Sequence, residues 1–120
     1  MLGEIKKFGF AFEGLRTGIK EHPHFRFHVV ASAVVIALAF YFNLSFFSWG
    51  LIIVAMAMVL ISELFNSALE TLCNLVEPNY NIHIKKVKDM AAAAVLVASI
   101  SALILLVIVV LLEFGIFFVG

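Results

Sequence analysis

The sequence is poor in charge, cysteine and proline. Only 13% of its 120 residues are charged and the formal net charge is zero. This balance argues against a nucleic-acid partner, which would require a basic face. Cys73 is the single cysteine, so an intramolecular disulfide is excluded.

Several motifs that carry chemistry in soluble enzymes are also missing. The spacing of a Gly-x-x-x-x-Gly-Lys-Ser/Thr phosphate loop recurs at Gly9 and Gly14, but no lysine follows. There is no Gly-x-Ser-x-Gly elbow and no Cys/His metal cluster. His22, His24 and His28 are close in sequence, but they flank a proline and an arginine. We interpret them as interfacial polar residues near a membrane span.

Long apolar runs dominate the chain instead. Hydrophobic residues make up 64% of it, well above the roughly half that is typical of soluble domains. Three runs, with their aromatic flanks, are long enough to cross a bilayer. We therefore predict an all-α integral membrane protein with one domain over residues 1–120 and membrane helices at about 27–43, 46–76 and 87–113.

Residues 4–20 predict an amphipathic helix in the membrane interface, ahead of a break at Pro23. The charged residues of this segment lie largely away from an apolar stripe with spacings of three and four. That stripe consists of Ile5, Phe8, Phe12, Leu15 and Ile19. The alternative is a helix that packs along its own bundle.

The placement of positive charge predicts the orientation. Residues 1–28 hold five lysines and arginines and the loop 77–89 holds three lysines, whereas the turn 43–49 holds no charge. The positive-inside rule then places the N-terminus and the loop 77–89 in the cytosol. We expect a multi-pass plasma-membrane protein with its C-terminus, and Glu113, at the outer side.

A polar stripe interrupts the second apolar run. Glu63, Asn66, Glu70 and Asn74 fall within roughly 80° of one another on a helix. Carboxylates at or near membrane depth are costly, so they are candidates for function. The alternative is that these polar side chains satisfy one another between packed helices.

The acidic residues fit phosphoryl transfer, which needs a metal, a cation and a positioned base. Glu63 is the deepest and partly desolvated, which suits it to accept a proton. Glu70 lies about 10 Å nearer the cytosol. Two carboxylates such as Glu21 and Glu70, with substrate phosphates, are what Mg²⁺ prefers. Lys88 and Asp89 open the third span, where a lysine can neutralise phosphate charge.

At these residues the chain resembles a known family, the small prokaryotic diacylglycerol kinases and undecaprenol kinases. Glu63-Leu-Phe-Asn66-Ser-Ala-Leu-Glu70 closely resembles the signature Glu-x-x-Asn-Thr/Ser-Ala-x-Glu of that family. Two further blocks match in order and spacing, from about residue 8 to 105. They are Lys88-Asp89-Met-Ala-Ala-Ala-Ala-Val, and Gly14-Leu-Arg16 with Glu21 and Phe25-Arg26-x-His28.

The resemblance implies an integral membrane kinase that moves the γ-phosphate of ATP to a lipid hydroxyl at the cytosolic interface. It also implies a homotrimer with active sites shared between subunits. The Phe25-Arg26-x-His28 block looks more like the undecaprenol kinase branch. Undecaprenol is therefore the favoured acceptor, with diacylglycerol as the alternative.

The resemblance also implies roles for single residues. Glu63 looks like the general base at the lipid hydroxyl, assisted by Asn66. Glu21 and Glu70 look like the Mg²⁺ ligands, and Arg16 lies in the block that lines the lipid site. The residues implied to contact ATP are Phe10, Glu21, Glu70, Asn79, Tyr80, Asn81, Lys88 and Asp89.

Two positions depart from the family pattern, and two other functions stay open. Asn74 stands where the signature often has an aspartate, and Asn81 stands where a histidine often follows the tyrosine. A small proton-coupled transporter would use Glu63 as a carrier carboxylate. The cytosolic clustering of the polar groups argues against it, since transport sites prefer the midplane. A non-catalytic assembly protein is the third possibility.

Overall fold

A computed structural model describes residues 1–115, and all its regular elements are helices. In chain order these are α1 (Leu2–Glu21), α2 (Pro23–Tyr41), α3 (Phe46–Val76) and α4 (Ile82–Val110), with a π-helical turn, η1, over Leu111–Gly115. The predicted all-α fold, with three long apolar helices after an N-terminal helix, is confirmed. The C-terminus, expected outside the cell, lies beyond the described residues.

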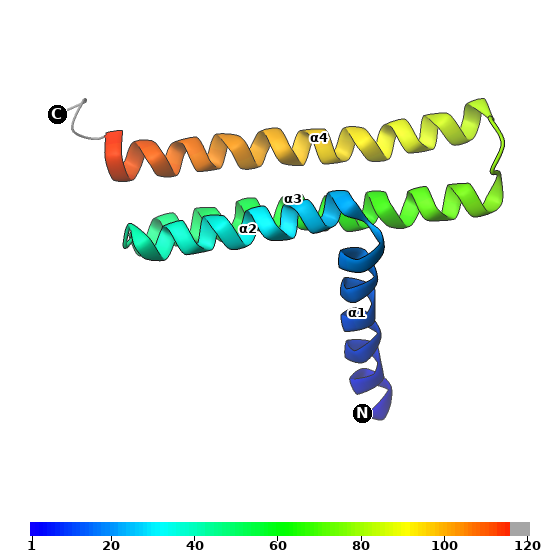
Figure 1. The fold of residues 1–120 in the computed structure, drawn as a ribbon, viewed down its shortest axis with the longest axis horizontal. Helices are drawn as coiled ribbons and strands as arrows, with labels where there is room; N and C mark the ends of the chain where they lie inside the picture. Colours follow the sequence, from blue (N-terminus) through cyan, green and yellow to red (C-terminus); the bar gives the residue numbers. More distant parts are fainter. Residues whose placement is uncertain (116–120) are drawn as a thin grey trace.

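The three long helices run side by side, and α1 stands across them (Figure 1). Each of the three is long and apolar enough to cross a membrane. Figure 1 also shows that one end of the α3–α4 pair extends beyond the level of α1. The molecule therefore has a membrane-spanning part, a crosswise helix and a two-helix projection.

Close contact at Gly18 fixes the end of α1 against the bundle. A Cβ atom at this glycine would lie 2.9 Å from Cδ2 of Phe25 in α2 and 3.1 Å from Cδ2 of Leu64 in α3. Phe25 is only 1% exposed. Next in the chain, His22 is extended and Pro23 begins α2, where its missing N–H leaves no bond unmade. Packing and the proline together set the crosswise path of α1.

The rest of α1 is not covered by its own chain. Gly18 is its only buried residue, and the phenylalanines Phe8 and Phe12 are 69% and 70% exposed. The alternative of a helix packed along its own bundle is therefore not what the structure adopts. An uncovered apolar stripe on a crosswise helix is the arrangement expected of an interfacial helix.

The length of α3 relates the functional residues to membrane depth. From Phe46 to Leu64, which packs against α1, the helix rises about 27 Å, close to the roughly 30 Å of a hydrocarbon core. From Leu64 to Val76 it continues for about 18 Å. Glu63 is thus level with the crosswise helix, and Glu70 lies in the projection.

The largest differences from the expected helix boundaries are at the starts of α2 and α4. α2 begins at Pro23 rather than near residue 27. α4 begins at Ile82 rather than near residue 87, because the Asn81 side chain accepts hydrogen bonds from the backbone N–H groups of His83 and Ile84, at 2.9 and 3.3 Å. Such an N-cap satisfies orphan donors and lets a helix begin there. α3 has the expected bounds, 46–76.

The core between the spans is thin, and half of the residues in its buried clusters are alanines. Two clusters of buried side chains form it, one around Ile52 and one around Val59. Between 11% and 22% of each apolar span is buried within the chain. The spans therefore leave most of their apolar surface for lipid or for other copies of the chain.

Candidate functional site

A buried carboxylate on α3 faces a histidine on α2. Oε1 of Glu63 lies 3.4 Å from Nε2 of His28, and the two side chains are 6% and 27% exposed. His28 is one of the histidines expected to be interfacial polar residues, and its contact with Glu63 was not predicted. The available signal was the Phe25-Arg26-x-His28 block itself, since His28 lies one helical turn beyond the anchored Phe25.

The pattern of α3 explains why Glu63 is buried. Its buried residues recur at intervals of four, as Ala55, Val59, Glu63 and Ser67, and positions four apart share one face of a helix. Glu63 therefore belongs to the packed face. The other members of the polar stripe differ in exposure, since Asn66 is half-buried whereas Glu70 and Asn74 are exposed.

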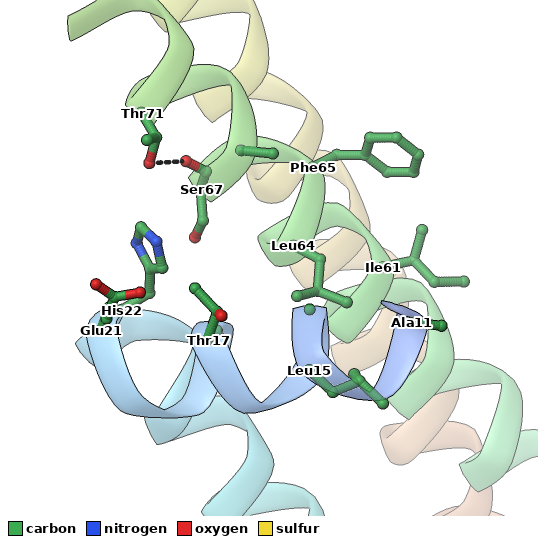
Figure 2. A pocket seen from close by; sticks show the side chains of 13 residues that line it. Ala11, Leu15, Thr17, Glu21, His22, Ile61, Leu64, Phe65, Ser67 and Thr71 are labelled. Carbon is green, nitrogen blue, oxygen red and sulfur yellow. Dashed lines mark hydrogen bonds between the residues drawn. The ribbon is translucent and has the colours of Figure 1, made fainter. Parts of the chain in front are cut away.

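A groove of about 1060 Å³ runs between α1 and α3. Figure 2 shows that its polar and apolar side chains occupy opposite ends. The polar end holds Thr17, Glu21, His22, Ser67 and Thr71, and the apolar end includes Ala11, Leu15, Ile61 and Phe65. Such a lining matches a ligand that has a polar head and an apolar body.

The projection holds a second polar contact between helices. Nζ of Lys88 in α4 donates to Oδ1 of Asn74 in α3 at 2.6 Å. Lys85 pairs with Asp89 at the same distance within α4. The family departure at residue 74 thus has a structural consequence, because an amide holds Lys88 in place without neutralising its charge.

Other expected site residues are not brought together within one chain. Glu21 lines the groove, whereas Glu63, Asn66 and Glu70 do not, and Glu70 is exposed. Phe10 and Arg16 are exposed on α1 and are also absent from the groove lining. Tyr80 is 80% exposed in the loop between α3 and α4.

The two asparagines beside Tyr80 have local hydrogen bonds. The Asn79 backbone N–H donates to Oε1 of Glu77 at 3.1 Å, and the Asn81 side chain caps α4. The loop is therefore held in shape by its own polar groups, with Tyr80 pointing away from the packed faces as an exposed ring.

The carboxylates can be compared with what a divalent cation requires. Within residues 1–115, no group of three or more His, Cys, Asp or Glu side chains could hold a metal by itself. The ion pairs of this part of the chain involve Glu4, Glu63 and Asp89, but neither Glu21 nor Glu70. Two carboxylates without protein cations suit Mg²⁺, which keeps its waters and takes its remaining ligands from substrate phosphates.

Comparison with known proteins gives a consistent result over most of the chain. A family model described as prokaryotic diacylglycerol kinase matches residues 9–110. A diacylglycerol kinase of Escherichia coli (strain K12) is 32% identical over 111 residues, which cover 92% of this chain and 91% of that protein. A diacylglycerol kinase of Helicobacter pylori is 33% identical over 96 residues, 80% of this chain and 75% of that one. An undecaprenol kinase of Bacillus subtilis is 29% identical over 101 residues, 84% and 82% of the two chains.

Proposed function

The chain belongs to the prokaryotic diacylglycerol kinase family and is a membrane lipid kinase with ATP as co-substrate, and we propose that it phosphorylates the primary hydroxyl of a membrane lipid at the cytosolic interface. One observation carries the proposal. Glu63 is buried on α3 at the level of the crosswise helix. A carboxylate is costly in that position and is retained there for a chemical role.

Glu63 serves as the general base. Its carboxylate accepts the proton of the lipid hydroxyl while the lipid oxygen bonds to the γ-phosphorus of ATP and the bond from that phosphorus to ADP breaks. Asn66, half-buried one turn further along α3, helps to position the reacting groups. Arg16, on the amphipathic helix, contributes to the lipid site.

The remaining polar residues bind the nucleotide. Glu21 and Glu70 would hold Mg²⁺, which would supply positive charge to the ATP phosphates. Lys88 and Asp89 contact ATP at the start of α4. The support is that Lys88 keeps its charge while it is held by the neutral Asn74. The loop residues 79–81 and Phe10 on α1 complete the nucleotide site.

The active unit is a homotrimer with sites shared between subunits. Within one chain, Glu70 lies outside the groove that Glu21 lines, so a complete metal site needs a neighbouring copy. A second groove, of about 630 Å³, lies between α3 and α4 and is lined partly by Ala93, Ala94 and Ala98. Small residues of this kind allow close approach of another helix in a membrane.

The chain is oriented with its N-terminus and the α3–α4 loop in the cytosol. The support is that α1 joins the bundle on the side where α4 begins (Figure 1), and the three lysines expected in the loop 77–89 lie in the first turns of α4. Glu113 lies at the opposite end, where it bonds to Ser45 and Ser48 beside the α2–α3 turn. This asymmetry agrees with the positive-inside rule.

Undecaprenol is the proposed acceptor, and diacylglycerol is the second candidate. The block that resembles the undecaprenol kinase branch lies directly at the candidate site, since Phe25 packs where α1 meets the bundle and His28 contacts Glu63. Diacylglycerol is supported by relatives named diacylglycerol kinase at 32% and 33% identity. Both lipids present a primary hydroxyl at the interface, and the groove accepts a polar head with an apolar tail.

A side-by-side kinase assay tests the proposal. Purified protein in mixed micelles receives labelled ATP, Mg²⁺ and either undecaprenol or diacylglycerol, and the phosphorylated lipid is quantified against a sample without lipid. A higher kcat/KM for undecaprenol supports the first acceptor, and the reverse order supports the second. Failure to phosphorylate either lipid, together with proton flux in liposomes without ATP, would favour the transporter alternative instead.

A further inference from the structure

We propose that His28 is a positioning residue for Glu63 and that it carries the proton of the lipid hydroxyl from Glu63 to cytosolic water. This inference rests on the proposed function, because it assigns Glu63 the role of base. It goes further by assigning a role to a histidine on another helix. The carrying observation is the 3.4 Å approach of Nε2 of His28 to Oε1 of Glu63 across the α2–α3 interface.

The burial of the two side chains gives the direction of proton movement. Glu63 is only 6% exposed, whereas His28 is 27% exposed. A carboxylate that accepts a proton in a site closed to water must release it again before the next turnover. His28 is the one histidine or basic side chain within 4 Å of Glu63 in the described structure, and its greater exposure gives the proton a route out.

The chemistry of the two groups favours the same direction. In water an imidazole binds a proton more tightly than a carboxylate does. After Glu63 has taken the proton from the lipid oxygen, the O–H bond on Glu63 breaks and an N–H bond forms at Nε2 of a neutral His28. The pair is then carboxylate and imidazolium, and the imidazolium loses its proton to water. No oxidant, reductant or further reactant is needed.

The charged groups around the pair are engaged elsewhere. From α2 itself, Arg26 donates to the backbone carbonyl oxygens of Ile19 and Lys20, at 3.2 and 3.4 Å. From α4, Lys88 is bonded to Asn74 in the projection. From α1, Glu21 and His22 line the groove. On α3 the next polar residue is the neutral Asn66.

Two substitutions at His28 and one control test the role. His28→Gln keeps a polar side chain but removes the proton acceptor. His28→Ala leaves space that added imidazole can occupy. His24→Gln changes an exposed histidine one turn earlier on α2. For each protein, size-exclusion profile, kcat and both KM values are measured on undecaprenol and diacylglycerol across pH, with and without imidazole.

We expect His28→Gln to lower kcat by about 100-fold, the usual scale for losing a proton-transfer group, with KM for ATP little changed. Added imidazole restores part of the rate to His28→Ala and not to Glu63→Gln. Because a protonated imidazole cannot accept a proton, the fall of kcat with acid differs between the wild type and His28→Gln, whereas His24→Gln follows the wild type.

Three results would overturn the proposal that His28 carries the proton from Glu63 to water. They are near wild-type kcat in His28→Gln, loss of activity of the same size in His24→Gln, and an assembled but inactive His28→Ala that imidazole does not rescue. If neither variant assembles, the wild-type profile decides, because a kcat that does not fall at any acidic pH at which the protein stays assembled contradicts the role. Absence of lipid kinase activity in the wild-type protein would instead contradict the proposed function. A failure of the role of His28 and a failure of the proposed function are therefore distinguishable.

Discussion

The bundle carries carboxylates in two regions, and their side chains have different partners. Beside the α2–α3 turn, which the proposed orientation makes the outer end, Oε1 of Glu113 accepts a hydrogen bond from the Ser45 backbone N–H at 2.9 Å and another from the Ser48 hydroxyl at 2.6 Å. At the level of α1, on the inner side in that orientation, the one ionic or hydrogen-bonding partner of Glu63 within residues 1–115 is His28, at 3.4 Å. Neither Glu21 nor Glu70 contacts a cationic side chain within residues 1–115.

This difference separates a structural carboxylate from candidates for chemistry. A polar group near membrane depth is costly unless it is satisfied. The serines satisfy Glu113 locally and join η1 to the start of α3. The inner carboxylates keep free acceptor positions, as groups that must bind a proton or a metal do. The position of a carboxylate in a membrane helix does not by itself distinguish a structural role from a chemical one, whereas its hydrogen-bonding and ionic partners do.

Neutralising one carboxylate at each end gives the largest contrast. We expect Glu63→Gln to lower kcat by at least about 100-fold, because an amide cannot accept the lipid proton. Glu113→Gln should keep a rate close to that of the wild type, since its end of the bundle takes no part in the reaction. Phosphorylated lipid formed per minute is the measurement.

Both variants must first be shown to keep the oligomer of the wild type by size exclusion in detergent. A fully active Glu63→Gln protein would rule out the base assignment. An inactive but assembled Glu113→Gln protein would instead show that the outer end contributes to catalysis, and the comparison between the ends would fail.

Removing one proposed metal ligand should have a smaller effect. Glu70→Gln is expected to raise the Mg²⁺ concentration for half-maximal rate by about tenfold, on the scale of weakened metal sites. At saturating Mg²⁺ much of the rate returns, because Glu21 and the ATP phosphates still hold the ion. Mg²⁺ titration at fixed ATP gives the measurement.

Glu13→Gln is the matched control for this titration, since Glu13 is exposed on α1 and does not line the groove. Its Mg²⁺ dependence should follow that of the wild type. An unchanged Mg²⁺ requirement in Glu70→Gln would count against Glu70 as a ligand.

Changing the partner of Lys88 should alter nucleotide binding modestly. Asn74→Asp puts a negative charge where Lys88 now bonds to a neutral amide at 2.6 Å. The lysine then attracts phosphate less, and we expect KM for ATP to rise about two- to fivefold, as for an exposed ion pair. The rise should shrink at high salt because exposed charges are screened.

Asn74→Ala separates charge from anchoring in this test. It frees Lys88 without pairing it, so any change in KM should depend on salt much as it does in the wild type. Equal KM values in Asn74→Asp and the wild type at low salt would mean that Lys88 does not contact the phosphates.

The contact between Asn74 and Lys88 also illustrates what a sequence can and cannot predict here. The helices were predictable because apolar length and a period of 3.6 residues are properties of single segments. The stripe from Glu63 to Asn74 followed in the same way. Which members of the polar stripe are buried could not be predicted, because burial depends on the face that α3 turns toward its neighbours.

Contacts between helices could not be predicted for the same reason. The approach of His28 to Glu63 depends on how α2 is rotated, which Gly18 and Phe25 set by packing. The start of α4 depends on the Asn81 cap, whereas the resemblance had implied only a contact with ATP for Asn81. The roles implied by family resemblance for Phe10, Arg16 and Tyr80 remain predictions, since their neighbours would come from ligands or other subunits.

The smallest effect on activity is expected at the outer end. Ser48→Ala removes the hydroxyl that donates to Glu113 from a position that is 0% exposed, and the half-buried Glu113 carboxylate loses one of its two donors. The melting temperature in detergent should fall by about 3 °C, while kcat and KM stay at wild-type values. Ser62→Ala is the control, because the Ser62 hydroxyl donates only to the Val59 carbonyl of its own helix, and its melting temperature should change less.

If Ser48→Ala left the melting temperature unchanged, the outer carboxylate would not stabilise the fold, and Glu113 would need another role. If it lowered the rate instead, the two ends would be coupled through α3.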